Sequence, residues 1–429
     1  MSFYKKECLR SLFPVYFWLI AFKLALDASY VFVLADNFRD VGYAMDFNVF
    51  RYISSWFLYC ILFYYVKANF VVIMDYFSIT AIVSLVSPLL VLYGLDHNRP
   101  FFPVFISILS FLVVLGTYGL LTRNSFYFKL RRIKHGKNYA ILFSSAFVIY
   151  LLIWYPLSGV TYNISFSDVY DFRRQNNAIS NFGFLAYLNF WILKVFSVFV
   201  LAYSLLKKKY FVSLAMIFVF VSYYAANTHK SVLFTPFLVL CIWFYFSRYS
   251  KLYIFPMAMF FLMLASIMSY KYLGDVWLSA LFPNRVFLIP AHLTFLYFDF
   301  FSVNDYLFYS NSFLSSYIEY PYDKPLSYLI GDYSGTPGAA ANNGYVSTGY
   351  AQGGVIVCLV YSFFIGMLLF IIDRVILSNQ IPSWFVLALF VVPMRDFLIN
   401  IDLLTTILTG GMFWTIILVY LSREKSSLR

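Results

Sequence analysis

The chain has 429 residues, of which 62% are apolar and only 12% are charged, and its mean hydropathy is +0.77. Soluble domains carry about twice that fraction of charge, so the composition excludes a water-soluble globular domain. The net charge of +12 does not indicate nucleic acid as a partner, because most of the excess Lys and Arg sits in short clusters between apolar runs, as orientation signals do.

Apolar runs close to the roughly 20 residues that a bilayer requires recur along the whole chain. They are continuously apolar rather than alternating, which favours helices over a β-barrel. The sequence therefore predicts an all-α polytopic bundle of about twelve transmembrane helices. They fall near residues 12–35, 51–67, 71–95, 101–122, 139–157, 184–206, 210–226, 231–247, 252–270, 347–372, 382–394 and 403–422.

The basic clusters fall on alternate sides of these spans. They put the N-terminal KKECLR and the C-terminal REKSSLR on the same side, as an even number of spans requires. By the positive-inside rule both termini are cytoplasmic. Residues 1–270 then hold helices one to nine with a smaller outer loop at 158–183. Residues 271–346 form a large outer loop containing short helices, and 347–429 hold the last three helices and a cytoplasmic tail.

The smaller outer loop contains the pair Arg173 and Arg174. Arginine on an outer loop runs against the orientation rule, and its guanidinium matches phosphate oxygens two at a time without ever deprotonating. A diphosphate is one ligand that explains the pair. An ordinary loop ion pair with Asp168 and Asp171 explains it equally well.

The large loop carries Arg285, His292 and Asp299 at intervals of seven residues. On a helix this spacing is close to two turns, so the three side chains are expected on one face, although Pro290 interrupts or kinks it. The functional interpretation gives Arg285 a phosphate and makes His292 or Asp299 a proton acceptor. The alternative is an amphipathic helix on the membrane surface with a solvated polar stripe.

Three further places are candidates for substrate binding. Asn342 and Asn343 lie in the Gly- and Ala-rich segment 331–357, where the amides suit sugar hydroxyls but the small residues equally suit close helix packing. Lys230 caps an outer turn between two spans. Arg395 and Asp396 lie in another such turn, where Arg395 suits a phosphate and Asp396 a proton, but interfacial anchoring is the commoner role.

Lys194 lies inside a predicted span and is expected to meet a buried partner or to extend to the interface. The cysteines Cys8, Cys60, Cys241 and Cys358 are scattered without metal or redox spacing. No Walker loop or dinucleotide glycine fingerprint is present. The sequence therefore predicts no metal and no cofactor.

This layout resembles the O-antigen (oligosaccharide repeat unit) polymerase family, Wzy. The resemblance covers nearly the whole chain and is mostly architectural. It consists of about a dozen spans, two unequal outer loops bearing Arg, and a small-residue loop returning into the membrane. The family's basic cluster before a glycine matches Arg173 and Arg174 ahead of Gly183, with a slightly shorter interval. Its arginine before an apolar, Pro-containing stretch matches Arg285, and its cation at the head of a span matches Lys230.

The resemblance implies a metal-independent, GT-C-like glycosyltransferase of the bacterial inner membrane. Such an enzyme transfers a growing glycan from undecaprenyl diphosphate to another lipid-linked repeat unit at the periplasmic face. Its expected partners are the undecaprenyl-diphosphate-linked oligosaccharide and membrane lipids, with a chain-length regulator and a flippase as further candidates.

Two other functions fit parts of the same pattern. An O-antigen ligase, which joins the finished glycan to lipid A-core, has a similar layout and the same donor. A polysaccharide or lipid-linked sugar transporter is the alternative from another class, but transporters are expected to show inverted repeats and broken helices near the bilayer midplane.

Overall fold

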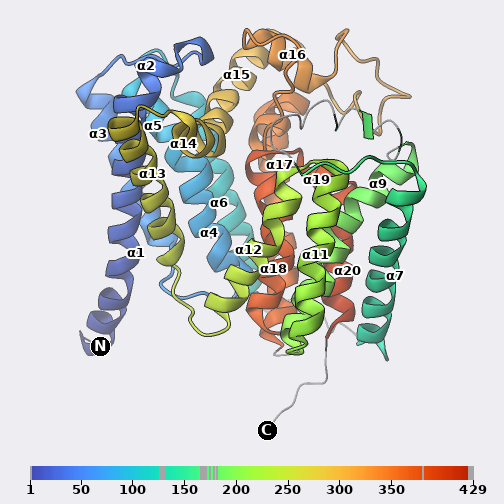
Figure 1. The fold of residues 1–429 in the computed structure, drawn as a ribbon. Coiled ribbons are helices and arrows are strands. Elements are labelled where there is room, and N and C mark those ends of the chain that lie inside the picture. The colour runs from blue at the N-terminus through green and yellow to red at the C-terminus, as the bar shows by residue number, and fades with distance from the viewer. Residues whose placement is uncertain are drawn as a thin grey trace.

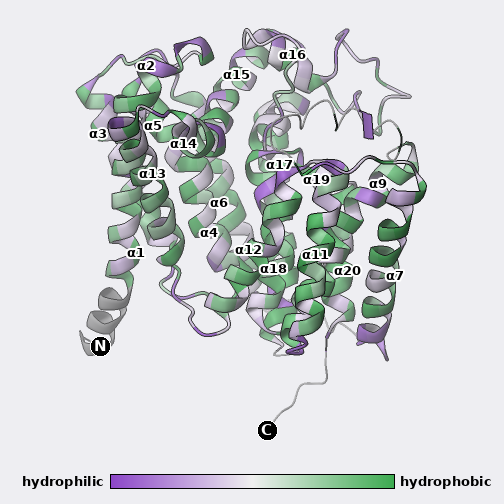
Figure 2. Ribbon diagram, in the orientation of Figure 1, coloured by the Kyte–Doolittle hydropathy of each residue, from purple (hydrophilic) through white to green (hydrophobic). Residues whose placement is uncertain are grey.

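The computed structural model describes residues 2–124, 132–164, 172, 175–176, 179, 182–378 and 381–423, with side chains described from residue 12 onward. Every regular element in these ranges is a helix, and the only extended pairing is two isolated bridges. Figure 1 shows the helices standing side by side in a broad bundle, with irregular segments at its two ends. Figure 2 shows hydrophobic residues along the helices and hydrophilic residues gathered towards those ends.

Helices follow one another throughout the described part of the chain. The first half contains α1 (Ser2–Ser29), η1 (Tyr30–Leu34), α2 (Ala35–Asn37), η2 (Arg39–Val41), α3 (Val49–Ile61), η3 (Leu62–Tyr65), α4 (Ile73–Ala81), η4 (Ile82–Val86), α5 (Ser87–Leu95), α6 (Phe102–Arg123), α7 (Gly136–Leu157), α9 (Phe184–Trp191), η5 (Ile192–Phe196) and α10 (Ser197–Leu206). The second half contains α11 (Tyr210–Asn227), α12 (Lys230–Phe246), α13 (Ile254–Leu273), α14 (Trp277–Ser279), η6 (Ala280–Leu288), α15 (Ile289–Val303), α16 (Leu326–Tyr333), α17 (Tyr345–Leu377), α18 (Ser383–Ile399), α19 (Leu403–Leu408) and α20 (Met412–Leu421).

Within the described residues, nine helices are long and apolar enough to cross a membrane. All but one coincide with predicted spans, which confirms a multi-pass membrane protein. The predicted spans near 51–67, 231–247, 382–394 and 403–422 form shorter or broken helices. The one long apolar helix that was not predicted as a span, Trp277–Val303, lies inside the segment that was predicted as a loop with short helices.

The basic loops meet at one end of the bundle, called the basic end below. Leu252 N donates to Ala68 O at 3.0 Å, and Ser383 Oγ donates to Val71 O at 2.6 Å. Asp373, near the end of α17, accepts from Ile73 N at 2.7 Å. These bonds join the loops around Lys67, Lys251 and Arg374, and Figure 1 shows the beginning of α1 and the end of α20 at this same end.

The segment Trp277–Val303 begins and finishes at the opposite end of the bundle. α13 starts at the basic end and leads away from it, and α17 returns to it, so the chain between them makes no net crossing. Figure 1 shows α14, α15 and α16 together at that opposite end. The apolar helix Trp277–Val303 therefore lies on the side where the large outer loop was predicted, although it is longer than the short helices predicted there.

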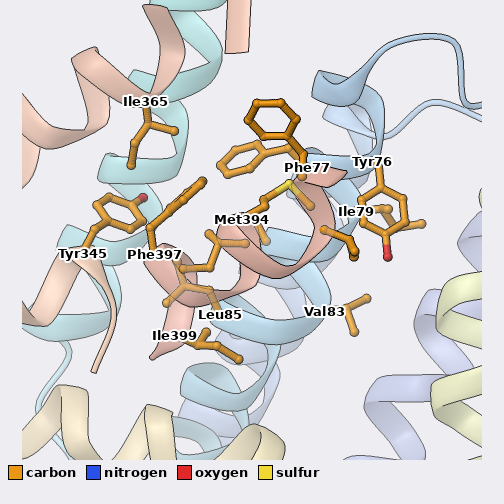
Figure 3. Packing of buried hydrophobic residues seen from close by; sticks show 14 of the residues in the cluster. Tyr76, Phe77, Ile79, Val83, Leu85, Tyr345, Ile365, Met394, Phe397 and Ile399 are labelled. Atoms are coloured by element: carbon orange, nitrogen blue, oxygen red, sulfur yellow. The ribbon is translucent and has the colours of Figure 1, made fainter. Parts of the chain in front are cut away.

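The core lies where α4, α17 and α18 meet. Figure 3 shows Phe77 and Leu85 facing Met394 and Phe397, with Tyr345 beside them. The rings of Phe77 and Phe397 stack with centroids 6.2 Å apart. Almost every residue of the window Ile73–Leu95 is buried in protein rather than exposed. This segment and α18 therefore form the centre of the bundle and position what lies on them.

α17 is broken at Gly353 and Gly354, and Gly354 has the positive φ of 67° that favours glycine. The short arm, Tyr345–Gln352, is buried throughout and folds back on the long arm, because Cys358 Sγ lies 3.2 Å from Val346 O. The glycine-rich segment thus re-enters the bundle as a short buried helix before the long one begins.

Candidate anion-binding site

Two predicted substrate-binding residues, Arg173 and Arg174, lie outside the described residues, as do the neighbouring Asp168 and Asp171. The remaining predicted residues divide between exposed and buried positions. Their placement separates cations that are available to a ligand from polar groups that hold the fold together.

Arg395 is exposed on a helix that is otherwise surrounded by protein. From Trp384 to Ile399, α18 is buried except for this residue and the half-buried Val392. The predicted turn at this position is wrong, because the helix continues to Ile399. Arg395 lies in the last two turns of α18, where its guanidinium is not covered by the rest of the protein.

Asp396, the next residue, is buried and has both carboxylate oxygens bonded. Lys194 Nζ lies 2.8 Å from Oδ2, and Asn400 Nδ2 donates to Oδ1 at 3.0 Å. The Asp396 side chain is 3% exposed and the Lys194 side chain 20%. The prediction that Lys194 meets a buried partner is confirmed, and the partner is Asp396. This pairing explains why a carboxylate occurs on α18 beyond residue 394, where the span was predicted to end. Asp396 is placed to hold Lys194 rather than to accept a proton from a ligand.

Lys194 lies in η5, a π-helical interruption of the span Phe184–Leu206. Its ammonium stands 4.2 Å from the ring centroid of Phe190. Single π-turns inside α-helices are frequent at functional sites. Sequence reasoning did not place Lys194 in the site, because its partner is 202 residues away; the only available signal was a lone cation inside an apolar run.

His292 and Asp299 lie seven residues apart in α15 and so keep the predicted face, whereas Arg285 lies outside this α-helix, which corrects the prediction for Arg285. Arg285 and Asp299 are exposed, whereas His292 is 6% exposed. Arg285 lies in the π-helical η6, whose wider turns change the register before α15 begins. Asp299 is exposed because it lies in the last turns of α15, at the end of the bundle.

His292 packs inside the outer part of the bundle. Its ring meets that of Tyr43 edge-on with centroids 5.7 Å apart, and its Nδ1 has no hydrogen-bond partner among the described residues. Tyr43 donates in turn to Asn284 Oδ1 at 2.7 Å. Burial raises the pKa of the Tyr43 phenol, which therefore stays a neutral donor. His292 thus joins the loop before α3 to the start of α15.

Asp299 is held by α16, because Tyr333 Oη donates to its Oδ2 at 2.5 Å. This bond raises the pKa of the Tyr333 phenol. Fourteen residues separate Asp299 from Arg285 along one continuous helical path, which is roughly 20 Å at the α-helical rise. The two side chains are therefore too far apart to bind the same group of a ligand.

Asn343 is buried and satisfied within the protein. Its Nδ2 donates to Pro290 O at 2.9 Å, Thr294 Oγ1 at 3.1 Å and Ser347 Oγ at 2.9 Å. It therefore joins the short arm of α17 to α15. Asn342 is exposed, and so is Lys230 at the first position of α12.

Two other outer arginines, Arg51 and Arg99, already bind groups of the protein itself. Arg99 pairs with Asp96 at 2.8 Å and donates to Gly42 O at 2.5 Å, and Arg51 binds the backbone oxygens of His97 and Arg99. Arg285 and Arg395 differ from Arg99, because neither makes an ion pair with another described residue. The segments that carry them, η6 and α18, both pack against η4.

The fold and this site define a multi-pass helical membrane protein with exposed arginines on segments that pack at the centre of its bundle. No cluster of His, Cys, Asp or Glu suited to a metal ion occurs among the described residues. Comparison with known proteins gives no match: no protein-family model, no curated protein and no solved structure matches this chain.

Proposed function

We propose that this protein is an O-antigen polymerase, which transfers a growing glycan from undecaprenyl diphosphate to another lipid-linked repeat unit. The observation that carries the proposal is Arg395, an exposed guanidinium on a helix buried on its other sides. Lys194 bonds Asp396, the next residue along α18, and Arg285 lies on a segment that packs against the same π-helix as α18.

The chemistry requires fixed positive charge. An acceptor hydroxyl oxygen attacks the anomeric carbon of the donor sugar, the bond from that carbon to the diphosphate oxygen breaks, and the diphosphate leaves with the bonding electrons. The hydroxyl proton passes to a base. Preorganised cations stabilise the leaving charge far better in a site shielded from water than in bulk water. Arg395 and Arg285 are assigned to the diphosphate, with Lys194 as a further cation.

The predicted catalytic residues take different roles in this proposal. Asp396 and His292 are buried and position their neighbours, so neither is assigned the proton. Asp299 stands too far along the helix from Arg285 to act at the same bond. Together with Tyr333 and the exposed Asn342, it is assigned to sugars further along the glycan. Carboxylates and amides are suited to bind sugar hydroxyls.

The proposal places the basic end in the cytoplasm, because Lys and Arg concentrate there. The opposite end, with α15 and α16, then faces the periplasm of a bacterial inner membrane. Twelve membrane passes and a GT-C-like arrangement belong to the proposal, as do the flippase and the chain-length regulator as partners. Both termini are then cytoplasmic.

The test compares Arg395→Ala with Arg39→Ala in cells that lack the chromosomal copy and make the cognate glycan. Arg39 is a matched control, because it is an outer arginine that is already paired with Asp36 at 2.9 Å and whose side chain is 75% exposed. We expect Arg395→Ala to abolish the ladder of long chains and to leave the single-repeat product, whereas Arg39→Ala keeps the ladder.

Protein amount and size-exclusion profile in detergent establish that each variant folds. A normal ladder from well-folded Arg395→Ala would refute the assignment of the diphosphate. Loss of single-repeat as well as long-chain product would favour the ligase, because a ligase attaches chains of any length to lipid A-core.

A further inference from the structure

A cavity of about 330 Å³ lies at the basic end, away from the site described above. Its walls are formed by the segment after α3, by the start of α4 and by one face of α6. One part of the lining is polar, with Tyr65, Lys67 and Asp75, and the other is apolar, with Leu112, Leu115 and Gly116.

At Gly116, one of the lining residues, α6 has no side chain. A Cβ added to Gly116 would meet no atom within 4 Å, and the residue is exposed. Only 39% of the most apolar window of α6 is buried in protein, so this helix presents much of its apolar surface outward. In a membrane protein such a surface faces lipid, and the hollow at Gly116 is open to acyl chains.

The polar part of the cavity is built around one charge pair. Lys67 Nζ lies 2.7 Å from Asp75 Oδ1, and the Lys67 side chain is 66% exposed while that of Asp75 is 1% exposed. Asp75 Oδ2 also accepts from Val71 N at 3.0 Å and Val72 N at 3.1 Å, so the carboxylate is fixed at the start of α4. An ammonium has three N–H donors, and those not used by Asp75 are open to a ligand.

We propose that this cavity binds one phospholipid, with an acyl chain against Gly116 and the phosphate on Lys67. The chemistry of the lining runs in the same order as that of the lipid, from a cation at the basic end to apolar walls further along α6. Gly116 lies seven residues before the end of α6 at Arg123, roughly 10 Å along the helix axis. That depth places the apolar walls beside acyl chains when Lys67 is at headgroup level. The inference is independent of the proposed glycosyl transfer.

The test uses the full chain in nanodiscs of phosphatidylethanolamine and phosphatidylglycerol that contain a small fraction of photoactivatable lipid. The probe is a phosphatidylethanolamine with a diazirine on one acyl chain, and cross-linked peptides are quantified by mass spectrometry. We expect labelling at Leu112 and Leu115 to exceed labelling at Leu120 several-fold. Leu120 is a fair reference, because it is 64% exposed on the same helix and is not part of the cavity lining.

Filling the hollow with Gly116→Leu is expected to reduce labelling of the cavity walls several-fold, whereas Leu120→Phe leaves it unchanged. Lys67→Gln is expected to reduce it as well, which provides a second variant if Gly116→Leu folds poorly. A phosphatidylglycerol probe should label as the phosphatidylethanolamine probe does, because both carry the phosphate.

A diacylglycerol probe without phosphate should label the cavity walls several-fold less. Equal labelling by diacylglycerol would overturn the contact with Lys67. Even labelling along α6 that Gly116→Leu does not change would overturn the site, because it is the result expected of lipid with no specific place.

Discussion

The pair formed by Lys194 and Asp396 offers a sharp test of the candidate site. Replacing Lys194 by Met leaves Asp396 buried with only Asn400 as a polar partner. Two unit charges 2.8 Å apart attract by about 6 kcal/mol at an effective dielectric constant of 20. Removal of one partner of a buried pair typically costs about 3–5 kcal/mol of folding free energy, because the other charge stays desolvated.

Removing both charges should cost far less. Lys194→Met combined with Asp396→Leu leaves no buried charge, and replacing a buried pair by apolar groups of similar volume is often neutral or stabilising. We expect the double variant to recover at least half of the loss caused by Lys194→Met. The coupling free energy of the double-mutant cycle is then about 2 kcal/mol or more.

The free energy of unfolding is measured by titrating the detergent-purified protein with sodium dodecyl sulfate and following tryptophan fluorescence. Trp191 lies one turn before Lys194 and donates to Thr409 O at 2.8 Å, so its emission reports on this region. If Lys194→Met lies within 1 kcal/mol of the wild type, or if the two single effects add, the buried-pair reasoning is refuted. Under the proposed function the double variant folds but makes few long chains.

Three other changes test separate parts of the structure. Asn343→Ala leaves Thr294 and the carbonyl of Pro290 with fewer partners in a buried position, and should lower the free energy of unfolding by about 1–3 kcal/mol. Gly344→Ala places a Cβ 2.0 Å from the Leu398 carbonyl oxygen. This overpacking should lower the free energy of unfolding by about 1–3 kcal/mol, measured by the same titration. The third concerns pH: bonds from Lys324 and a backbone N–H hold the pKa of Asp332 below its ordinary value. The ionised Asp332 therefore stabilises α16 fully at pH values above the ordinary pKa of Asp, about 3.9. This stabilisation is lost as the pH falls through the lower pKa that Asp332 has in the folded protein. Hydrogen exchange of the Gly338 amide should therefore accelerate, relative to its intrinsic rate, in that acidic range.

Each of these changes has a control in the same chain. Asn342→Ala alters an exposed amide and should leave the free energy of unfolding unchanged, so an equal effect at both positions would contradict the role given to Asn343. Gly116→Ala meets open space and should stabilise its helix by up to about 1 kcal/mol. Lys324→Gln should move the acid-dependent change in Gly338 exchange to higher pH, because the bond from Lys324 is the largest cause of the lowered pKa of Asp332. An unchanged midpoint would exclude the ion pair as a cause.

The amino-acid sequence by itself determined the class of the protein and the position of most spans. Continuous apolar runs such as 71–95 and 101–122 are local properties, and the bilayer's thickness sets their length. The gathering of the basic loops at one end also followed from the sequence, because charge on short loops alternates with each span. The glycine-rich segment 331–357 was predicted as a loop that returns into the membrane, and its part from Tyr345 to Gln352 is a buried helix in the structure.

The tertiary structure alone decided which polar residues are available to a ligand. Arg395 and Asp396 are neighbours in sequence, yet one is exposed and the other is buried on Lys194, 202 residues away. His292 and Asn343 looked like ligands in the sequence, but packing against Tyr43 and bonds to α15 give them structural surroundings. A polar side chain satisfied by a distant partner and one left open look the same in sequence, because burial is set by what packs against the helix.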